Sequence, residues 1–461
     1  MATSSFTAVV TTGIYCRDGC PATPLRRNTL PYEYAAAAEA AGFRPCLRCR
    51  PDRVPDPGWV DAPELVCRAL RLITDGYLDG ATEDVLAARL GVSARHLRRL
   101  FDEHVGATPA EVARSRRAHF ARRILDDTEL SIAEVSRAAG FTTVRHMNRV
   151  MKQVFQFTPQ ELRAKRRDPR RLVADGGLEL RLPYRAPLAW DTMIRYLAPR
   201  AIPGVEAVDV DAGVYRRTIV FGDAPGVIEV RDSDERTHVL LRVHLSRFDG
   251  LVHLVQQVRR QFDLDADPEA IDAFLARDPK LRPLVRRHRG LRVPGAYDPV
   301  ELGARAILGQ QVTVAGATRL AGRVVEAHGT PVPGLEALGL THTFPSAAVL
   351  GDAPLERLGL TAARARAVRE FAAASPKLRF DGGMPLAELV GVLVDLPGIG
   401  AWTAHYIAMR AAGERDAFPA GDLGLRKALD APSAHAVGEA SNRWRPWRAY
   451  AAMQLWCSTS A

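Results

Sequence analysis

The chain has 461 residues, of which 63 are basic and 53 acidic, so its formal net charge is +10 and its isoelectric point is about 9.6. This length is typical of about three domains, and the basic balance favours a polyanionic partner over a small neutral substrate. No apolar run reaches the roughly eighteen residues that a membrane-spanning helix needs, and no basic segment followed by an apolar stretch opens the chain. We therefore expect a soluble, cytoplasmic protein with no membrane partner.

Four of the six cysteines lie within the first fifty residues and form a C-x3-C pair and a C-x2-C pair: Cys16, Cys20, Cys46 and Cys49. Cysteines about two to four residues apart can present both sulfurs to one metal ion. The array therefore predicts one tetrahedral Zn²⁺ site. A purely structural ion is one interpretation, and a reactive zinc-thiolate is the other.

The surrounding segment, Phe6 to Asp52, contains TTGIYCR and AAGFRPCLRC and closely resembles the Ada-type N-terminal metal-binding domain. The resemblance implies that the zinc-bound thiolate of Cys16 takes a methyl group from a methylphosphotriester in DNA, and that the methylated form activates transcription. Four thiolates on one Zn²⁺ carry a charge of about −2, which repels the phosphate backbone. Loss of one negative charge on methylation should then raise the affinity for DNA.

The next segment, 58–171, has helical apolar spacing throughout and repeats one design twice, in 84–101 and 131–155. Each repeat has a short helix, a turn containing glycine and a second helix. In the first repeat, Ser93 is a plausible N-cap of the second helix. In the second repeat, Thr142 or Thr143 can cap the corresponding helix.

The second repeat leaves Arg145, His146 and Arg149 available to a major groove. The two repeats together resemble the AraC-type DNA-binding domain over essentially its full length. This implies operator DNA and RNA polymerase as partners, and two recognition helices in one chain predict a monomer. Basic side chains are dense on the linking helix and after the second repeat. Such runs usually mark a solvated face, but beside two groove-sized helices we expect phosphate contact by these runs as a whole, without assigning it residue by residue: Arg114, Arg116, Arg117, Arg122, Arg123, Arg163, Lys165, Arg166, Arg167, Arg170 and Arg171.

Residues 178–286 mix strand-like segments such as GVIEV and HVLLRVHL with amphipathic helices, which indicates a small α+β lobe. The stretch PYRAPLAWDTMIRYLAPRAIPGVE resembles the N-terminal lobe of 3-methyladenine DNA glycosylase II.

Beyond this lobe, 287–461 is helical and contains Pro397-Gly398-Ile399-Gly400 between two helices. Glycines in such a hairpin let backbone N–H groups approach a phosphate closely. With the following WTAHY, the later DAFPAGDLGLRKAL and the final RWRPWRAYAAMQLW, this region resembles the helix-hairpin-helix glycosylases. The resemblance implies double-stranded alkylated DNA as substrate and a monovalent cation at the hairpin.

Asp422 falls on the catalytic aspartate of that family, although an ordinary N-cap is the alternative role. Breaking an N-glycosidic bond builds positive charge on the sugar, and a carboxylate aimed at it lowers the barrier or positions water. Trp402, Tyr406 and Trp456 would by default be core aromatics. The resemblance instead places them around the flipped base, where their ring faces suit cationic N-alkylated purines.

Trp402 occupies the position at which backbone-cleaving relatives carry a Schiff-base lysine, so a monofunctional glycosylase is expected. No iron–sulfur cluster is expected either, because Cys457 stands alone near the C-terminus. Gln311, in ILGQQVTV, lies where some relatives present an apolar wedge that fills the gap left by the flipped nucleotide.

The fold class predicted from these observations is multidomain and mainly α. It comprises a zinc-binding α/β domain (1–57), an all-α double helix-turn-helix domain (58–171), an α+β lobe (178–286) and an all-α glycosylase domain (287–461). The predicted function joins an alkylation sensor, a transcriptional activator and a base-excision glycosylase. Two alternatives remain open: a regulator whose glycosylase-like half only binds DNA, and a glycosylase whose zinc domain is a structural relic.

Overall fold

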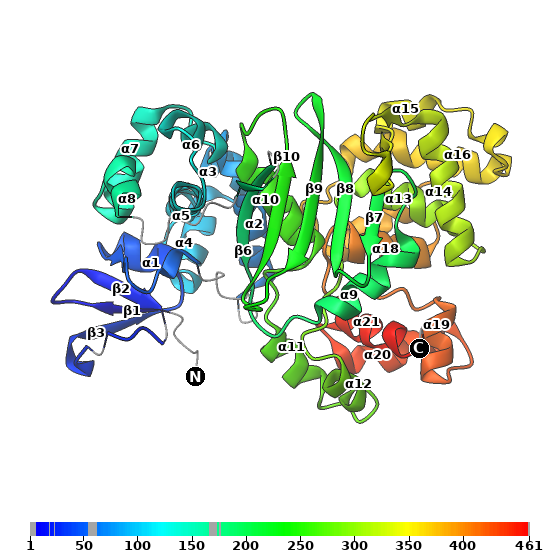
Figure 1. Cartoon of the computed structure of the whole chain (residues 1–461). Helices are drawn as coiled ribbons and strands as arrows, with labels where there is room; N and C mark the ends of the chain where they lie inside the picture. Colours follow the sequence, from blue (N-terminus) through cyan, green and yellow to red (C-terminus); the bar gives the residue numbers. More distant parts are fainter. Residues whose placement is uncertain are drawn as a thin grey trace. The chain divides into compact units, whose positions relative to one another are not determined.

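The computed structural model describes residues 6–17, 19–22, 24–53, 62–165, 173–174 and 177–459 (Figure 1). The chain forms two compact units. Unit 1 comprises residues 1–184 and 246–257, and unit 2 comprises 185–245 and 258–461. Among the described residues, no helix is long and apolar enough to cross a membrane. The expected class, multidomain and mainly helical with small sheets, is confirmed.

Unit 1 begins with a small sheet whose strand order is β3-β1-β2-β4. Apolar residues alternate along β1, so that Phe6 and Ala8 point into a core shared with Tyr15 and the alanine-rich helix α1. Strand β4 pairs with β2 in parallel, which brings the two halves of the cysteine array together. The elements are β1 (Phe6–Val9), β2 (Ile14–Arg17), β3 (Thr29–Tyr32), α1 (Ala35–Ala40) and β4 (Arg44–Pro45).

The two helix-turn-helix repeats follow, joined by the long helix α5. Ser93 caps α4 and Thr143 caps α7, each accepting a hydrogen bond from a backbone N–H of the first turn, as the sequence predicted. The turn glycines Gly91 and Gly140 both have a positive φ of 74°. The helices are α2 (Glu64–Thr74), α3 (Glu83–Arg89), α4 (Ala94–His104), α5 (Pro109–Asp127), α6 (Ile132–Ala138), α7 (Val144–Phe155) and α8 (Pro159–Ala164).

The arginines of α5 correct one expectation. Arg122 is only 2% exposed and Arg123 donates to the carbonyl oxygen of Asp52, while Arg116 and Arg117 both pair with Asp79. A buried guanidinium needs internal partners, and these aspartates supply them. Phosphate contact was expected of this basic run as a whole; Arg122 is too buried to take part in it, and its paired neighbours are engaged within the protein. The predicted contacts of Arg166, Arg167, Arg170 and Arg171 lie outside the described residues.

Unit 1 is completed by two further segments. Strand β5 (Val173–Ala174) pairs with β6 (Gly177–Pro183). Residues 246–257, which include the start of α10 (Leu251–Gln261), return to the second helix-turn-helix repeat. There Asp249 forms an ion pair with Arg137 at 2.7 Å.

Unit 2 contains an antiparallel run of strands in the order β10-β9-β8-β7. The predicted strands are present. The short strand β7 at the edge of this run was not predicted, nor was the two-stranded pair β11 (Thr330–Pro331) and β12 (His342–Thr343) elsewhere in unit 2. With α9 the strands of this run give this part of unit 2 the mixed α and β content that was expected (Figure 1), although residues 178–184 and 246–257 of the predicted lobe belong to unit 1. The elements are α9 (Trp190–Leu197), β7 (Glu206–Asp209), β8 (Val214–Phe221), β9 (Ala224–Asp232), β10 (His238–His244), α11 (Pro268–Leu275) and α12 (Arg282–Arg287).

The rest of unit 2 is almost entirely helical, as predicted. The hairpin lies between α17 and α18, and the last helix α21 packs against α19. The helices are α13 (Pro299–Leu308), α14 (Val314–His328), α15 (Ala347–Asp352), α16 (Ala362–Ala374), α17 (Leu386–Val394), α18 (Ala401–Arg410), α19 (Leu423–Leu429), α20 (Ala434–Ser441) and α21 (Arg448–Thr459).

Candidate metal centre and candidate glycosylase site

The four N-terminal cysteines converge on one point in unit 1. Cys16 lies on β2, Cys20 follows that strand, and Cys46 and Cys49 follow β4. The backbone N–H of Cys46 donates to the carbonyl oxygen of Tyr15 at 2.9 Å, which places the second pair beside the first. All four sulfurs lie within 4.8 Å of one another. Zn–S bonds of about 2.3 Å in a tetrahedron separate sulfurs by about 3.8 Å, so the cluster fits a single zinc ion.

Burial and hydrogen bonding together shift the pKa values of three of these thiols in different directions. Desolvation raises the pKa of the buried Cys16 thiol and raises that of Cys49 to about 12. Burial acts the same way on Cys46, but the backbone N–H groups of Cys49 and Arg48 outweigh it and lower the pKa of that thiol. A zinc ion supplies the positive charge that holds all four sulfurs as thiolates when it is bound.

Helix α7 carries the predicted groove-reading side chains on its outer face. Arg145 and Arg149 are exposed, whereas His146 is half-buried and packs edge-on against Phe141 with ring centroids 5.5 Å apart. Burial also lowers the pKa of His146, which favours the neutral imidazole. The opposite face of α7 is apolar and buried. Of the three predicted side chains, the two arginines are therefore open to solvent, and His146 is less accessible.

Asp422 in unit 2 is engaged through both carboxylate oxygens. Its Oδ1 accepts hydrogen bonds from the backbone N–H of Leu425 at 3.0 Å and from Trp456 Nε1 at 2.9 Å. Its Oδ2 accepts one from Trp402 Nε1 at 3.1 Å. The residue is thus the N-cap of α19, and it is also bound by two of the three aromatics that the resemblance assigned to the base pocket.

The aromatic residues form one group around this carboxylate. Trp402 and Tyr406 stack with ring centroids 5.4 Å apart and an interplanar angle of 12°. Tyr406 and Trp456 are tilted at 59° with centroids 6.3 Å apart. Trp402 and Tyr406 are both half-buried. The structure therefore brings together all four residues predicted for catalysis and base recognition.

The hairpin and the predicted wedge are also connected. Gly398 has a φ of 78°, and a Cβ there would lie 2.7 Å from the Cβ of Ala367. Gln310 donates to the carbonyl oxygen of Gly398 at 2.8 Å and to Thr403 at 3.0 Å. Its neighbour Gln311 is exposed at the turn between α13 and α14, with a positive φ of 57°. Gly400 is the N-cap residue that precedes α18, and a Cβ there would meet no atom within 4 Å.

One further residue, Arg410, was not predicted from the sequence. Arg410 is buried, donates to the hydroxyls of Tyr196 at 3.1 Å and Tyr406 at 3.0 Å, and also bonds the carbonyl oxygen of Pro294. Burial opposes ionisation of Tyr406, but the charge of Arg410 prevails and lowers the pKa of that phenol. The only available signal was that Arg410 stands four positions after Tyr406 on one helix, and an arginine there would ordinarily be taken as solvated.

Three family models match the chain: the metal-binding domain of Ada at residues 1–52, a helix-turn-helix domain at 86–165, and the AlkA N-terminal domain at 179–298. DNA-3-methyladenine glycosylase 2 of Escherichia coli is 31% identical over 285 residues, covering 60% of this chain and 95% of that protein.

Among solved structures, the 3-methyladenine DNA-glycosylase from Archaeoglobus fulgidus matches with a TM-score of 0.54, covering 61% of this chain and 98% of its own. Its sequence identity is 24%, so this likeness concerns the fold alone.

A relative that spans all the regions is the probable bifunctional transcriptional activator/DNA repair enzyme AlkA of Mycobacterium tuberculosis. It is 42% identical over 459 residues, covering 97% of this chain and 92% of that protein. Because this likeness extends through the cysteine cluster, both helix-turn-helix repeats and the helix-hairpin-helix region, the chain belongs to the family of bifunctional transcriptional activator/DNA repair enzymes AlkA.

Proposed function

We propose that the protein is a monofunctional DNA glycosylase for alkylated purines, joined to a zinc-thiolate sensor and a DNA-binding regulator. The observation that carries the glycosylase assignment is the carboxylate of Asp422, which accepts hydrogen bonds from Trp402 and Trp456, while the ring of Trp402 stacks on that of Tyr406. The domain boundaries expected from the sequence, at 57, 171 and 286, form part of the same proposal.

In the proposed reaction the bond between C1′ of the sugar and the ring nitrogen of the base breaks, and its electron pair leaves with the base. Positive charge develops on the sugar, where the Asp422 carboxylate stabilises it and positions water. Water then bonds to C1′ and loses a proton. An N-alkylated purine is already cationic and leaves readily, so stacking on Trp402 and Tyr406 can provide much of the selectivity.

At the metal centre we propose Cys16 as the methyl acceptor. Its sulfur attacks the methyl carbon of a methylphosphotriester, the carbon–oxygen bond breaks, and the phosphodiester leaves with the electron pair. The four cysteines then carry one negative charge fewer, which favours association with DNA.

The regulatory assignment rests on α4 and α7, whose caps and exposed arginines suit two major-groove contacts. We further propose that the protein acts as a monomer in the cytoplasm, contacts RNA polymerase when bound to its operator, and holds a monovalent cation at the hairpin.

Base release from alkylated duplex DNA tests the glycosylase. Wild-type protein should release 3-methyladenine and 7-methylguanine, and Asp422→Asn should slow release by about 100-fold or more. Asp211→Asn, at an exposed turn of unit 2, is the matched control and should behave as wild type. If wild-type protein bound the DNA but released no base, the glycosylase-like half would be a binding module.

Mass spectrometry tests the sensor separately. Zinc-loaded protein incubated with methylphosphotriester DNA should gain one methyl group, located on Cys16. An unmodified Cys16 in fully loaded protein would instead favour a structural zinc domain.

A further inference from the structure

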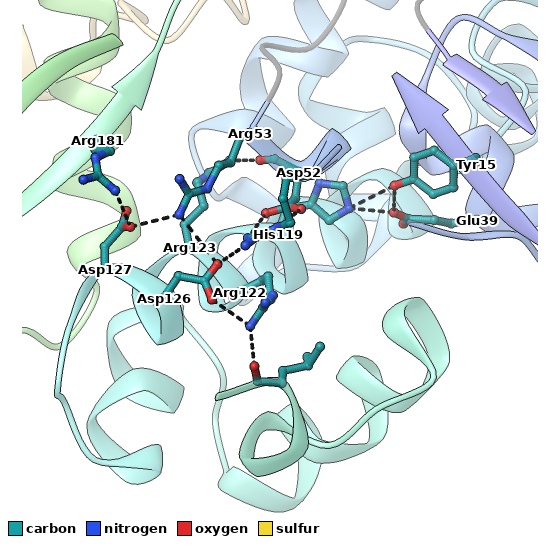
Figure 2. A network of polar contacts seen from close by, with 12 residues as sticks. Tyr15, Glu39, Asp52, Arg53, His119, Arg122, Arg123, Asp126, Asp127 and Arg181 are labelled. Carbon is teal, nitrogen blue, oxygen red and sulfur yellow. Dashed lines mark hydrogen bonds and ion pairs between the residues drawn. The ribbon is translucent and has the colours of Figure 1, made fainter. Parts of the chain in front are cut away.

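Helix α5 buries an unusual set of ionisable side chains. His119, Arg122, Asp126 and Asp127 all lie in its C-terminal half and are at least nine-tenths buried. Each must find polar partners inside the protein, because an unpaired buried charge is strongly destabilising. Most of these partners come from the cysteine-bearing segment of unit 1, and Figure 2 shows the resulting network.

The first connection reaches the strand that carries Cys16. Tyr15, the residue before it, is fully buried, and its hydroxyl donates to Glu39 Oε1 at 2.8 Å. His119 of α5 lies with Nε2 at 2.6 Å from the same oxygen and 3.4 Å from the Tyr15 hydroxyl (Figure 2). The imidazole thus ties β2 and α1 to the helix that joins the two DNA-reading repeats.

The second connection begins directly after Cys49. Arg50 has a left-handed backbone, with a φ of 54°, and binds Asp52 through two hydrogen bonds of 2.9 and 2.6 Å. Its remaining terminal nitrogen pairs with Asp126 of α5. Asp126 also pairs with Arg122 at 2.9 Å, and Arg123 donates to the carbonyl oxygen of Asp52 at 2.8 Å.

The network continues to the neighbouring elements. Arg122 donates to the carbonyl oxygen of Leu162 in α8 at 2.9 Å, which reaches the second helix-turn-helix repeat. Asp127 accepts from Arg53 at 3.1 Å and from Arg181 of β6 at 3.4 Å (Figure 2). Charged groups from four segments therefore meet on one face of α5, within a single compact unit.

We propose that His119 and Asp126 are positioning residues for the cysteine cluster, so that the DNA-reading domain itself helps to hold the metal ligands. His119 fixes the residue before Cys16, and Asp126 fixes the residue after Cys49. Outer partners of this kind set ligand orientation and metal affinity. The proposal rests on metal binding by the four cysteines and is independent of methyl transfer and of base release.

A thermodynamic consequence follows for the whole of unit 1. If α5 stabilises the metal site, then metal binding must stabilise α5 by the same amount, because coupling between two sites is reciprocal. Zinc loading would then rigidify the helix between the two recognition helices. The metal centre and the DNA-reading repeats would act as one cooperative element rather than as two tethered modules.

Zinc affinity of the full chain, measured by competition with a chromophoric chelator, tests the positioning role. Asp126→Asn should weaken zinc binding by about 10-fold or more, in the range typical of outer-partner changes. Asp102→Asn, at an exposed position of α4, is the control and should bind zinc as wild type does. His119→Leu should also weaken binding, whereas His119→Gln, which keeps an N–H for Glu39, should restore most of the affinity.

Two measurements separate positioning from a merely structural role. A double-mutant cycle measures zinc affinity in Arg50→Gln, Asp126→Asn and the double variant. The double variant should bind zinc only slightly more weakly than either single variant, because each single change already removes the ion pair between Arg50 and Asp126. Hydrogen exchange should show α5 and α7 amides less protected after zinc removal from wild type, and little changed by zinc removal in Asp126→Asn.

The proposal is overturned if Asp126→Asn and His119→Leu both retain wild-type zinc affinity, or if zinc removal leaves the protection of α5 unchanged in wild-type protein. Neither readout uses DNA. A failure here is therefore distinct from a failure of the sensor or of the glycosylase.

Discussion

At the scale of single residues, Asp422 illustrates why a structural and a catalytic role need not be alternatives. Its Oδ1 caps α19 through the N–H of Leu425, while the two indole N–H groups fix the direction of the carboxylate. Capping and the proposed catalytic role require the same rigid placement of the carboxylate. A side chain held by three donors needs little reorganisation as charge develops on a substrate.

Two substitutions at this position should separate the roles. Asp422→Asn keeps an acceptor for the Leu425 N–H, whereas Asp422→Ala removes it and should cost about 1 kcal/mol of stability. Both should abolish most base release, because both remove the carboxylate. Single-turnover kinetics and thermal denaturation of the two variants measure this difference. Loss of activity in the alanine variant alone would assign the effect to the cap.

A second residue-scale prediction concerns Asp263 in unit 2. Burial raises its pKa to about 6, although Arg292, the Tyr450 hydroxyl at 2.7 Å and the backbone N–H of Val293 act in the opposite direction. A carboxyl group with a raised pKa favours the folded state below the unfolded pKa of about 4, and this contribution is lost as the pH rises through 6.

Asp263→Asn should therefore gain stability relative to wild type between pH 4 and pH 6, by up to about 3 kcal/mol, with no further relative gain above that window. Asparagine also tolerates the positive φ of 50° at this site. Urea denaturation at several pH values measures the difference, with Asp211→Asn as the exposed control. A constant difference across the whole range would show that Asp263 does not titrate in this way.

At the scale of elements, the hairpin between α17 and α18 uses its two glycines for different purposes. Gly398 needs a left-handed backbone and has Ala367 where a Cβ would lie. Gly400 has a φ of −90° and open space around it. The first glycine is required by the fold, and the second leaves room for an approaching partner.

Alanine substitutions at the two glycines should therefore have different effects, one on protein stability and the other on DNA binding. Gly398→Ala should destabilise the protein by about 1–3 kcal/mol, through backbone strain and the contact with Ala367. Gly400→Ala should leave stability nearly unchanged and weaken binding to duplex DNA, because its methyl group occupies the space that a phosphate would approach. Chemical denaturation and fluorescence anisotropy measure the two effects. Equal stability losses in both variants would contradict this division.

At the scale of the whole molecule, some of the basic residues that give the net charge of +10 form ion pairs within the protein. Three arginines of α5, in a run expected to contact phosphate, form internal ion pairs: Arg116, Arg117 and Arg122. Arg145 and Arg149 of α7 are exposed instead. The basic balance of the chain thus serves both internal cohesion and association with DNA.

This division predicts different behaviour in salt. Arg149→Ala, at an exposed position of α7, should reduce the slope of log affinity against log salt by about 1 without loss of stability. Arg122→Ala should leave the slope unchanged and destabilise unit 1, because Asp126 and the carbonyl of Leu162 lose a buried partner. DNA titrations at several salt concentrations, with thermal denaturation of both variants, provide the measurement. A reduced slope for Arg122→Ala would show that this side chain reaches phosphate after all.

The sequence by itself determined the features that depend on local pattern. Cysteine spacing indicated the metal cluster, hydroxyl caps before apolar periodicity located α4 and α7, and glycines between two helices located the hairpin. The aromatic and acidic residues of the glycosylase site were identified through family motifs, and the structure places them together. These signals are readable because each depends on residues close in the chain or on a motif of fixed spacing.

Tertiary structure alone decided which charges are internal. Asp52 and Arg123 are hydrogen-bonded although they lie 71 residues apart in the sequence, and Arg410 and Tyr196 although they lie 214 residues apart. No local sequence pattern predicts either contact. The same holds for the parallel pairing of β4 with β2, which completes the cysteine cluster. An arginine looks alike in sequence whether it faces phosphate or a buried aspartate. Its environment depends on how distant segments pack, because burial and pairing are properties of the folded chain.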